Sequence, residues 1–274
     1  GVIANLPNIT TLPHFHVIAY NQLTQANLTV GGASMVGTLN AQLYGPIKGA
    51  LTALGAGDRI NLLSTTAANP LLIKDESLTN YTPQLNAIFQ GAPFNMPAQQ
   101  AGLFAAVFGQ ARQTTSADLV LLTTRGAIAS APTATDSGLG IAPPAPLDKF
   151  GITFPLQDKH VLVPSEILEI ATATDAYNTT IQTAATTNNL AFVDAKAIMN
   201  QLVSTGIVAN NYTLTSTFVT GGTFSLDGVH PSPRGYALIA NEFLKAINAA
   251  YGSNFKGVNV GTYRILYPQN PDNF

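Results

Sequence analysis

Several chemical features are missing from this 274-residue chain, and each absence excludes a class of protein. No cysteine is present, which excludes disulfide bonds, thiolate metal sites and a cysteine nucleophile. Although 46% of the residues are hydrophobic, no stretch approaches the about 18 uninterrupted apolar residues of a membrane-spanning helix. The sequence therefore indicates a globular protein that is stabilised by packing.

Charge is also scarce. Lys, Arg, Asp and Glu make up 9% of the residues and the net charge is -2, whereas about 25% of an average globular protein is charged. The charged residues form no runs, so no basic surface is expected for a nucleic-acid backbone or an anionic membrane. A surface of Thr, Asn, Ala and Gly fits an exported protein better than a cytosolic one. Residues 1–4 lack the features of a signal peptide, so any export signal is expected upstream.

The hydrophobic pattern predicts alternating strands and helices, which is typical of α/β proteins. Residues 2–5 predict a buried strand that opens into a loop at Pro7. Residues 164–189 predict a helix with Ser165 as its N-cap, followed by a strand at 190–193 that pairs with the first. Further helices are predicted over 38–54, about 80–90, and 98–112, further strands over 60–63 and 119–123, and a proline-rich loop over 126–164.

Ser232-Pro233 predicts the start of a last helix that runs to about Ala250, because serine is a good N-cap and proline is favoured at the first helical position. Asp227 and His230 stand just before this helix. A carboxylate three residues ahead of a histidine can accept a hydrogen bond from the Nδ1 proton, which leaves Nε2 free as a general base. For a bare Asp-x-x-His pair, a turn cap beside an ordinary polar histidine is the simpler alternative. The longer pattern around the pair favours the catalytic interpretation.

That pattern is Asp227-Gly228-Val229-His230-Pro231-Ser232, followed by Gly235-Tyr236. It resembles the last motif of the SGNH, or GDSL-like, serine hydrolases. The opening Gly1-Val2-Ile3-Ala4-Asn5-Leu6-Pro7 is similar to the fourth strand and following loop of large bacterial lipoprotein-type members. The resemblance implies a flavodoxin-like α/β fold with a parallel sheet, and a Ser-His-Asp triad in which His230 is the base and Asp227 orients it. It assigns residues 1–21 and 161–274 to the C-terminal part of the hydrolase domain and 22–160 to an insertion or cap.

Two motifs of this family are absent from the chain, namely the Gly-Asp-Ser that carries the nucleophile and the Gly-x-Asn-Asp that supplies an oxyanion donor. We therefore expect the chain to begin in mid-fold, with a sheet that is incomplete at its N-terminus and the serine upstream. The isolated chain is expected to be inactive. The free side of the first strand is expected to pair with the missing N-terminal segment or with a second chain.

The resemblance also implies a bacterial cell-envelope or secreted location and no metal or organic cofactor. The substrate would be an ester or an acylated small molecule, lipid or glycan, cleaved through an acyl-serine intermediate. The rival interpretation is a non-catalytic cell-envelope module that binds glycan, lipid or protein through its middle region.

Four other segments are weaker candidates. Gly32-Ala33-Ser34-Met35-Val36-Gly37 superficially resembles a nucleophile elbow but has one residue too many, so a flexible loop is preferred. His14 and His16 at strand spacing could bind a metal, yet no third ligand is nearby, and loop polarity explains them more simply. His160 lies in a charged segment that predicts a solvated turn. Residues 102–108 predict core packing, with an acyl or lipid pocket as the alternative.

Overall fold

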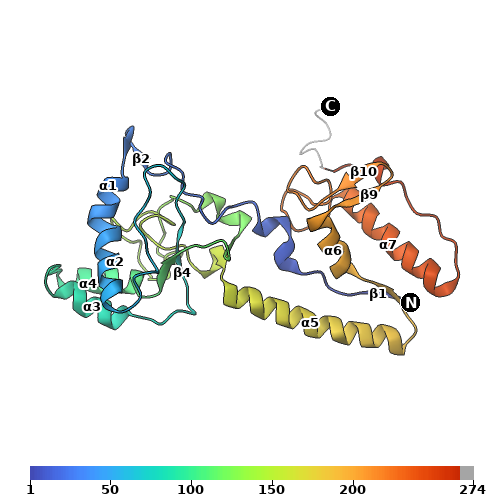
Figure 1. The fold of residues 1–274 in the computed structure, drawn as a ribbon, viewed down its shortest axis with the longest axis horizontal. Helices are drawn as coiled ribbons and strands as arrows, with labels where there is room; N and C mark the ends of the chain where they lie inside the picture. Colours follow the sequence, from blue (N-terminus) through green and yellow to red (C-terminus); the bar gives the residue numbers. More distant parts are fainter. Residues whose placement is uncertain (266–274) are drawn as a thin grey trace. The chain divides into compact units, whose positions relative to one another are not determined.

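The computed structural model describes residues 1–265. The chain forms two compact units, one made of Gly1–Val17 with the chain from Glu166 onward, and the other of Ile18–Ser165 (Figure 1). Residues 266–274, the end of the predicted 161–274 segment, lie outside the described part. That the first unit is the C-terminal part of a hydrolase domain and the second an insertion or cap stays a prediction. No helix in residues 1–265 has the length and apolar character needed to cross a bilayer.

The first unit contains the predicted pair of parallel strands. Strand β1 (Val2–Ala4) pairs in parallel with β8 (Ala191–Val193), and Ile3 stands opposite Phe192. The helix α7 (Pro233–Tyr251) packs against both strands. Within the described residues these strands form a two-stranded sheet, so the predicted flavodoxin-like parallel sheet is represented by this pair alone. The coarse α/β character is present, with helices beside parallel strands.

Capping residues fix the helices of this unit. The predicted N-cap Ser232 is confirmed, because its hydroxyl accepts a hydrogen bond from Gly235 N at 3.0 Å. The helix α6 (Ala195–Ser204) is capped in the same way by Asp194. The N-cap predicted at Ser165 is wrong, since α5 (Pro164–Thr187) already includes Pro164 as its first residue. Proline suits that position because its missing N–H has no partner in the first helical turn.

Short elements complete the first unit. Strand β9 (Ile207–Ala209) pairs antiparallel with β10 (Tyr212–Leu214) through a two-residue turn of Asn210 and Asn211, both at positive φ, as tight hairpins require. The 3-10 helices are η1 (Ile9–Thr11), η2 (Pro13–Phe15) and η6 (Val260–Thr262). The core of this unit is a small buried cluster: Met199, Leu202, Leu214, Phe224, Ala237, Leu238 and Val260.

The second unit is built on helices that match most of the predicted ones. A continuous helical stretch comprises α1 (Val36–Leu39), the π-helical turn η3 (Asn40–Tyr44) and α2 (Gly45–Ala53). The helices α3 (Thr82–Gln90) and α4 (Ala98–Phe108) pack against each other (Figure 1). The helix predicted over 98–112 ends four residues early. At Gly109 a Cβ atom would lie 2.1 Å from Thr82 Oγ1, so the chain turns there on a residue without a side chain.

The strands of the second unit form three antiparallel pairs: β2 (Thr29–Val30) with β3 (Ala33–Ser34), β4 (Leu72–Lys74) with β5 (Ala111–Gln113), and β6 (Leu119–Val120) with β7 (Val161–Leu162). The strand predicted over 119–123 stops at Val120 and continues as the 3-10 helix η4 (Leu122–Gly126).

The strand predicted over 60–63 is wrong for a specific reason. Asn61 N donates to Gln113 Oε1 at 2.8 Å, and Leu63 N donates to Asn40 Oδ1 at 2.8 Å. Side-chain amides therefore satisfy the backbone groups that a neighbouring strand would otherwise pair.

The second unit contains a largely buried ion network. Arg112 donates to Asp75 Oδ2 through Nε at 2.6 Å and to both carboxylate oxygens of Asp118 at 2.6 and 2.7 Å. Asp118 has a fully buried side chain. Burial opposes ionisation of Asp75, but hydrogen bonds from Ser77 and Arg112 outweigh it and hold its pKa below the usual range. These charges are thus mutually satisfied and are used for structure.

Candidate active site

The turn that carries Asp227 and His230 is closed by backbone hydrogen bonds immediately before α7. Ser225 N donates to His230 O at 2.8 Å, and Gly228 N donates to Ser225 O at 3.0 Å. Gly228 has a φ of +70°, and a Cβ atom there would lie 2.7 Å from His14 N. Glycine is therefore required at this position both for backbone conformation and for space.

Asp227 and His230 form the predicted contact. His230 Nδ1 lies 2.6 Å from Asp227 Oδ2, within the 3.2 Å limit for a hydrogen bond that orients a base. The other carboxylate oxygen, Oδ1, accepts hydrogen bonds from Ser225 Oγ at 2.6 Å, Val229 N at 2.9 Å and His230 N at 3.0 Å. Both oxygens of the carboxylate are thus fixed by the turn itself.

The electrostatics of the turn favour an ionised carboxylate. Partial burial opposes the charge on Asp227, but hydrogen bonds from Ser225, from His230 and from the Val229 amide outweigh it. Together they hold the pKa of Asp227 well below its usual range. Beside an ionised Asp227 the ring proton resides on His230 Nδ1, and in the neutral imidazole Nε2 then carries the lone pair. Both side chains are open to solvent, at 47% for Asp227 and 71% for His230.

His14 is a contact of this turn that the sequence did not reveal. Its ring Nδ1 lies 2.9 Å from Asp227 O, and its backbone N donates to Gly228 O at 3.0 Å. The residue follows β1 in the loop at the carboxyl end of that strand, which is where functional groups gather in parallel α/β sheets. That position is the one signal by which sequence alone could have singled it out.

The metal alternative for His14 and His16 gains no support from the geometry. The two residues lie in and after the 3-10 helix η2 instead of a strand, so they do not share a strand face. His16 Nε2 contacts Thr10 O at 2.9 Å, while His14 contacts the Asp227 turn. Within residues 1–265, no group of three or more His, Asp or Glu side chains is arranged to hold a metal ion.

Ser34 is not in a nucleophile elbow. It belongs to β3, in a hairpin whose turn is Gly31-Gly32 at φ values of 58° and 83°. The expected flexible loop is therefore an ordered hairpin. Ser34 Oγ accepts a hydrogen bond from Val36 N at 3.4 Å.

His160 is buried, and the solvated turn predicted for it is wrong. Its side chain packs edge-on against Phe150, with ring centroids 5.2 Å apart, and Nδ1 accepts a hydrogen bond from Gln157 N at 3.0 Å. Burial and then the neighbouring Lys159 lower its pKa below the usual value. His160 therefore supports the packing of the second unit as a neutral imidazole.

Residues 102–108 form part of α4 and supply core residues such as Phe104 and Phe108, as predicted. The outer side of the helix also borders a cavity of about 570 Å³, which Leu103 and Phe104 line together with Pro144 and Pro146. The prediction of core packing is confirmed for the buried residues of this segment. The acyl or lipid pocket stays a prediction, and the cavity is the place where it would lie.

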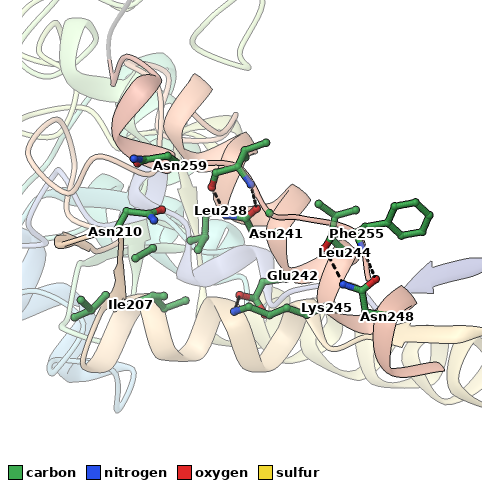
Figure 2. Close-up of a pocket in the computed structure, with 14 residues that line it drawn as sticks. Ile207, Asn210, Leu238, Asn241, Glu242, Leu244, Lys245, Asn248, Phe255 and Asn259 are labelled. Carbon is green, nitrogen blue, oxygen red and sulfur yellow. Dashed lines mark hydrogen bonds and ion pairs between the residues drawn. The ribbon is translucent and has the colours of Figure 1, made fainter. Parts of the chain in front are cut away.

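A separate hollow of about 460 Å³ lies in the first unit beside α7 (Figure 2). Its lining includes Leu238 and Leu244 as well as the ion pair of Glu242 and Lys245. None of its lining residues belongs to the Asp227–His230 turn, so it is distinct from the candidate active site.

The arrangement at the turn supplies a general acid–base group but no nucleophile. An imidazole held through Nδ1 by a carboxylate can accept a proton at Nε2 and return it to a leaving group. It needs a hydroxyl or a water molecule as its reaction partner.

A family model described as GDSL-like Lipase/Acylhydrolase matches residues 19–243. The match includes Asp227 and His230 as well as the whole 22–160 segment. No curated protein and no solved structure matches the chain.

Proposed function

The chain belongs to the GDSL-like lipase/acylhydrolase family, and on that premise we propose that it carries the acid–base part of a serine ester hydrolase. The observation that carries this proposal is the 2.6 Å contact between His230 Nδ1 and Asp227 Oδ2. In the neutral imidazole this contact leaves the lone pair on Nε2, on a side chain that is 71% exposed and on a turn that the family match includes.

In the proposed reaction, His230 Nε2 accepts the proton of a serine hydroxyl as the hydroxyl oxygen attacks the ester carbonyl carbon. The imidazolium then gives this proton to the departing alcohol, which leaves an acyl-serine. Water, activated by the same histidine, hydrolyses the acyl-serine. Asp227 stays ionised throughout and stabilises the imidazolium. The scheme requires no metal or organic cofactor.

The nucleophile in this proposal comes from polypeptide outside the 274 residues. The chain contains no Gly-Asp-Ser segment, and the 71% exposure of His230 leaves room for a further segment to cover it. The outer edge of β1, which has no strand partner in the described residues, offers a place for that segment or for a second chain to pair.

The second unit takes the role of an insertion or cap in this scheme, since Ile18–Ser165 is compact with its own core. The substrate is an ester or an acylated small molecule, lipid or glycan. The scarcity of charge supports a secreted or cell-envelope location.

The test compares this chain with the complete gene product on p-nitrophenyl esters of graded chain length, with fluorophosphonate labelling alongside. We expect turnover and labelling for the gene product and neither for the 274-residue chain. In the gene product, His230→Ala is expected to lower kcat by about 10⁴- to 10⁶-fold.

A labelled serine within this chain, with Ser34 the first to be mapped, would contradict an external nucleophile. A gene product that neither turns over esters nor reacts with the probe would instead favour the non-catalytic envelope module.

A further inference from the structure

His14 makes two hydrogen bonds to consecutive backbone carbonyls of the catalytic turn. Its ring Nδ1 contacts Asp227 O at 2.9 Å, and its backbone N donates to Gly228 O at 3.0 Å. A carbonyl oxygen can only accept, so His14 Nδ1 must carry a proton. The ring therefore acts as a donor that holds the backbone of the same residue whose side chain orients His230.

The hydrogen bonds that close the turn join residues 225–230 to one another, so the two bonds from His14 add an anchor from a segment 213 positions away. The Asp227 and His230 side chains are 47% and 71% exposed, and the turn contains the flexible Gly228 at positive φ. The missing Cβ of Gly228 lets the His14 backbone approach closely, since a Cβ would lie 2.7 Å from His14 N. Pro13, which precedes His14 in η2, is buried, so the donor follows a packed residue.

We propose that His14 is a positioning residue of the hydrolase, one that fixes the Asp227 backbone so that the carboxylate stays aligned with His230 Nδ1. This inference rests on the proposed function for its catalytic consequence. It does not make His14 a catalytic residue, because its ring contacts a backbone carbonyl and none of the reacting atoms.

Substitutions of His14 can separate the effect of its hydrogen-bond donor from the effect of its ring shape. The side-chain amide nitrogen of His14→Asn stands where Nδ1 stood and can still donate to Asp227 O. His14→Phe keeps a ring but has no donor, and the amide nitrogen of His14→Gln lies too far out, at the former Nε2 position. His16→Phe is the matched control, because His16 lies two residues away and contacts Thr10 O instead of the turn.

The first measurement is the ¹H–¹⁵N NMR signal of the His230 Nδ1 proton in the 274-residue chain, which needs no nucleophile. We expect a downfield, slowly exchanging proton in the unmodified chain, in His14→Asn and in His16→Phe. In His14→Phe and His14→Gln this signal is expected to move upfield or broaden by exchange. If His14→Phe fails to fold, judged from the amide signals of α7, His14→Gln carries the test.

The second measurement is kcat and KM of the complete gene product on a p-nitrophenyl ester. Misplacement of a catalytic group by about 1 Å costs on the order of 10²-fold in rate, so His14→Phe and His14→Gln should lower kcat by about that factor with KM little changed. His14→Asn should restore most of kcat.

An unchanged His230 Nδ1 signal in His14→Gln would overturn the proposal, as would an equal change in His16→Phe or a failure of His14→Asn to rescue. If the NMR result holds but the gene product hydrolyses no ester, His14 still positions the turn and the hydrolase assignment fails instead.

Discussion

Asp227 illustrates how a solvent-exposed carboxylate can be held rigidly by local hydrogen bonds. Its Oδ1 accepts from the Ser225 hydroxyl and two backbone amides, while Oδ2 faces His230 Nδ1. Because these donors favour the charged form, the pKa of Asp227 stays well below its usual range. Its stabilising effect is therefore complete at neutral pH and is lost only as the pH falls below the ordinary range for a carboxyl group.

The first prediction concerns this carboxylate. Asp227→Asn should lower kcat of the complete gene product by about 10⁴-fold, because an amide facing Nδ1 favours the wrong tautomer of His230. Steady-state kinetics with a p-nitrophenyl ester measure the effect. Ser225→Ala is the control, since it removes a donor to Oδ1 and leaves the Oδ2 contact. Equal losses in both variants would show that the turn, and not the Asp227–His230 contact, is what the reaction needs.

A second prediction follows from the buried His160. Its pKa is lowered in the folded protein, so between the ordinary histidine value of about 6.5 and the lower folded value the unfolded chain binds more protons. The free energy of unfolding should therefore be largest above the ordinary histidine pKa and should fall as the pH drops from there toward the lower folded pKa.

This is tested by urea unfolding between pH 5 and 8, monitored with a spectroscopic probe in the second unit. His160→Asn keeps an acceptor for Gln157 N without a titrating ring, so its stability should vary less with pH over this interval. The difference between the two proteins removes the contribution of His14, His16 and His230. Parallel pH curves for both proteins would refute the role of His160.

At the scale of secondary-structure elements, α7 shows how side chains can replace a strand partner. Asn241 donates to Val258 O at 2.9 Å and accepts from Val258 N at 2.7 Å. Asn248 makes the same pair of bonds with Phe255, at 2.9 and 2.8 Å (Figure 2). Residues 255–258 are thus fastened along α7, and Phe255, Gly257 and Val258 line the hollow beside that helix.

The third prediction is that Asn241→Ala lowers the free energy of unfolding by about 1–3 kcal/mol, because both backbone groups of Val258 lose a partner in a partly buried place. Hydrogen exchange should show lost protection at the Val258 amide. Lys245→Ala on the same helix removes an exposed ion pair with Glu242 and should cost less than about 1 kcal/mol. Undiminished protection at Val258 in Asn241→Ala would contradict the proposed clamp.

At the scale of the whole molecule, the two units have separate buried clusters. The cluster of the second unit runs from Ile18 to Val163 and lies entirely within that unit. The ion network of Arg112 with Asp75 and Asp118 is also internal to it. Since folding depends on burying a contiguous core, this unit contains what it needs to fold.

The fourth prediction is that a fragment of residues 18–165 folds on its own. Its ¹H–¹⁵N spectrum should superimpose on the corresponding signals of the 274-residue chain, and it should unfold cooperatively in urea. Asp118→Asn in the fragment serves as the control, because breaking a buried ion pair typically costs about 3–5 kcal/mol. A fragment with a collapsed, poorly dispersed spectrum would show that the second unit depends on the rest of the chain.

The sequence by itself determined the features that rest on near neighbours. The Asp227–His230 contact joins residues three apart, and the cap at Ser232 joins residues three apart, so local spacing specifies both. The parallel pairing of β1 with β8 joins distant residues, such as Val2 and Ala191, and its prediction came from the topology that the family resemblance implies. Whether the Asp227–His230 contact serves ester hydrolysis stays a prediction.

Apart from that strand pairing, tertiary structure alone decided the contacts that join distant segments. His14 meets Asp227 across 213 positions, and Asn61 meets Gln113 across 52, so no local pattern could indicate either contact. His160 looked exposed because its sequence neighbours are charged, yet Phe150 covers it. Hydrogen-bond donors find their acceptors, and apolar surface is buried, among whichever segments the packed chain brings together. Periodicity and spacing describe only neighbours along the chain, and therefore could not identify these partners.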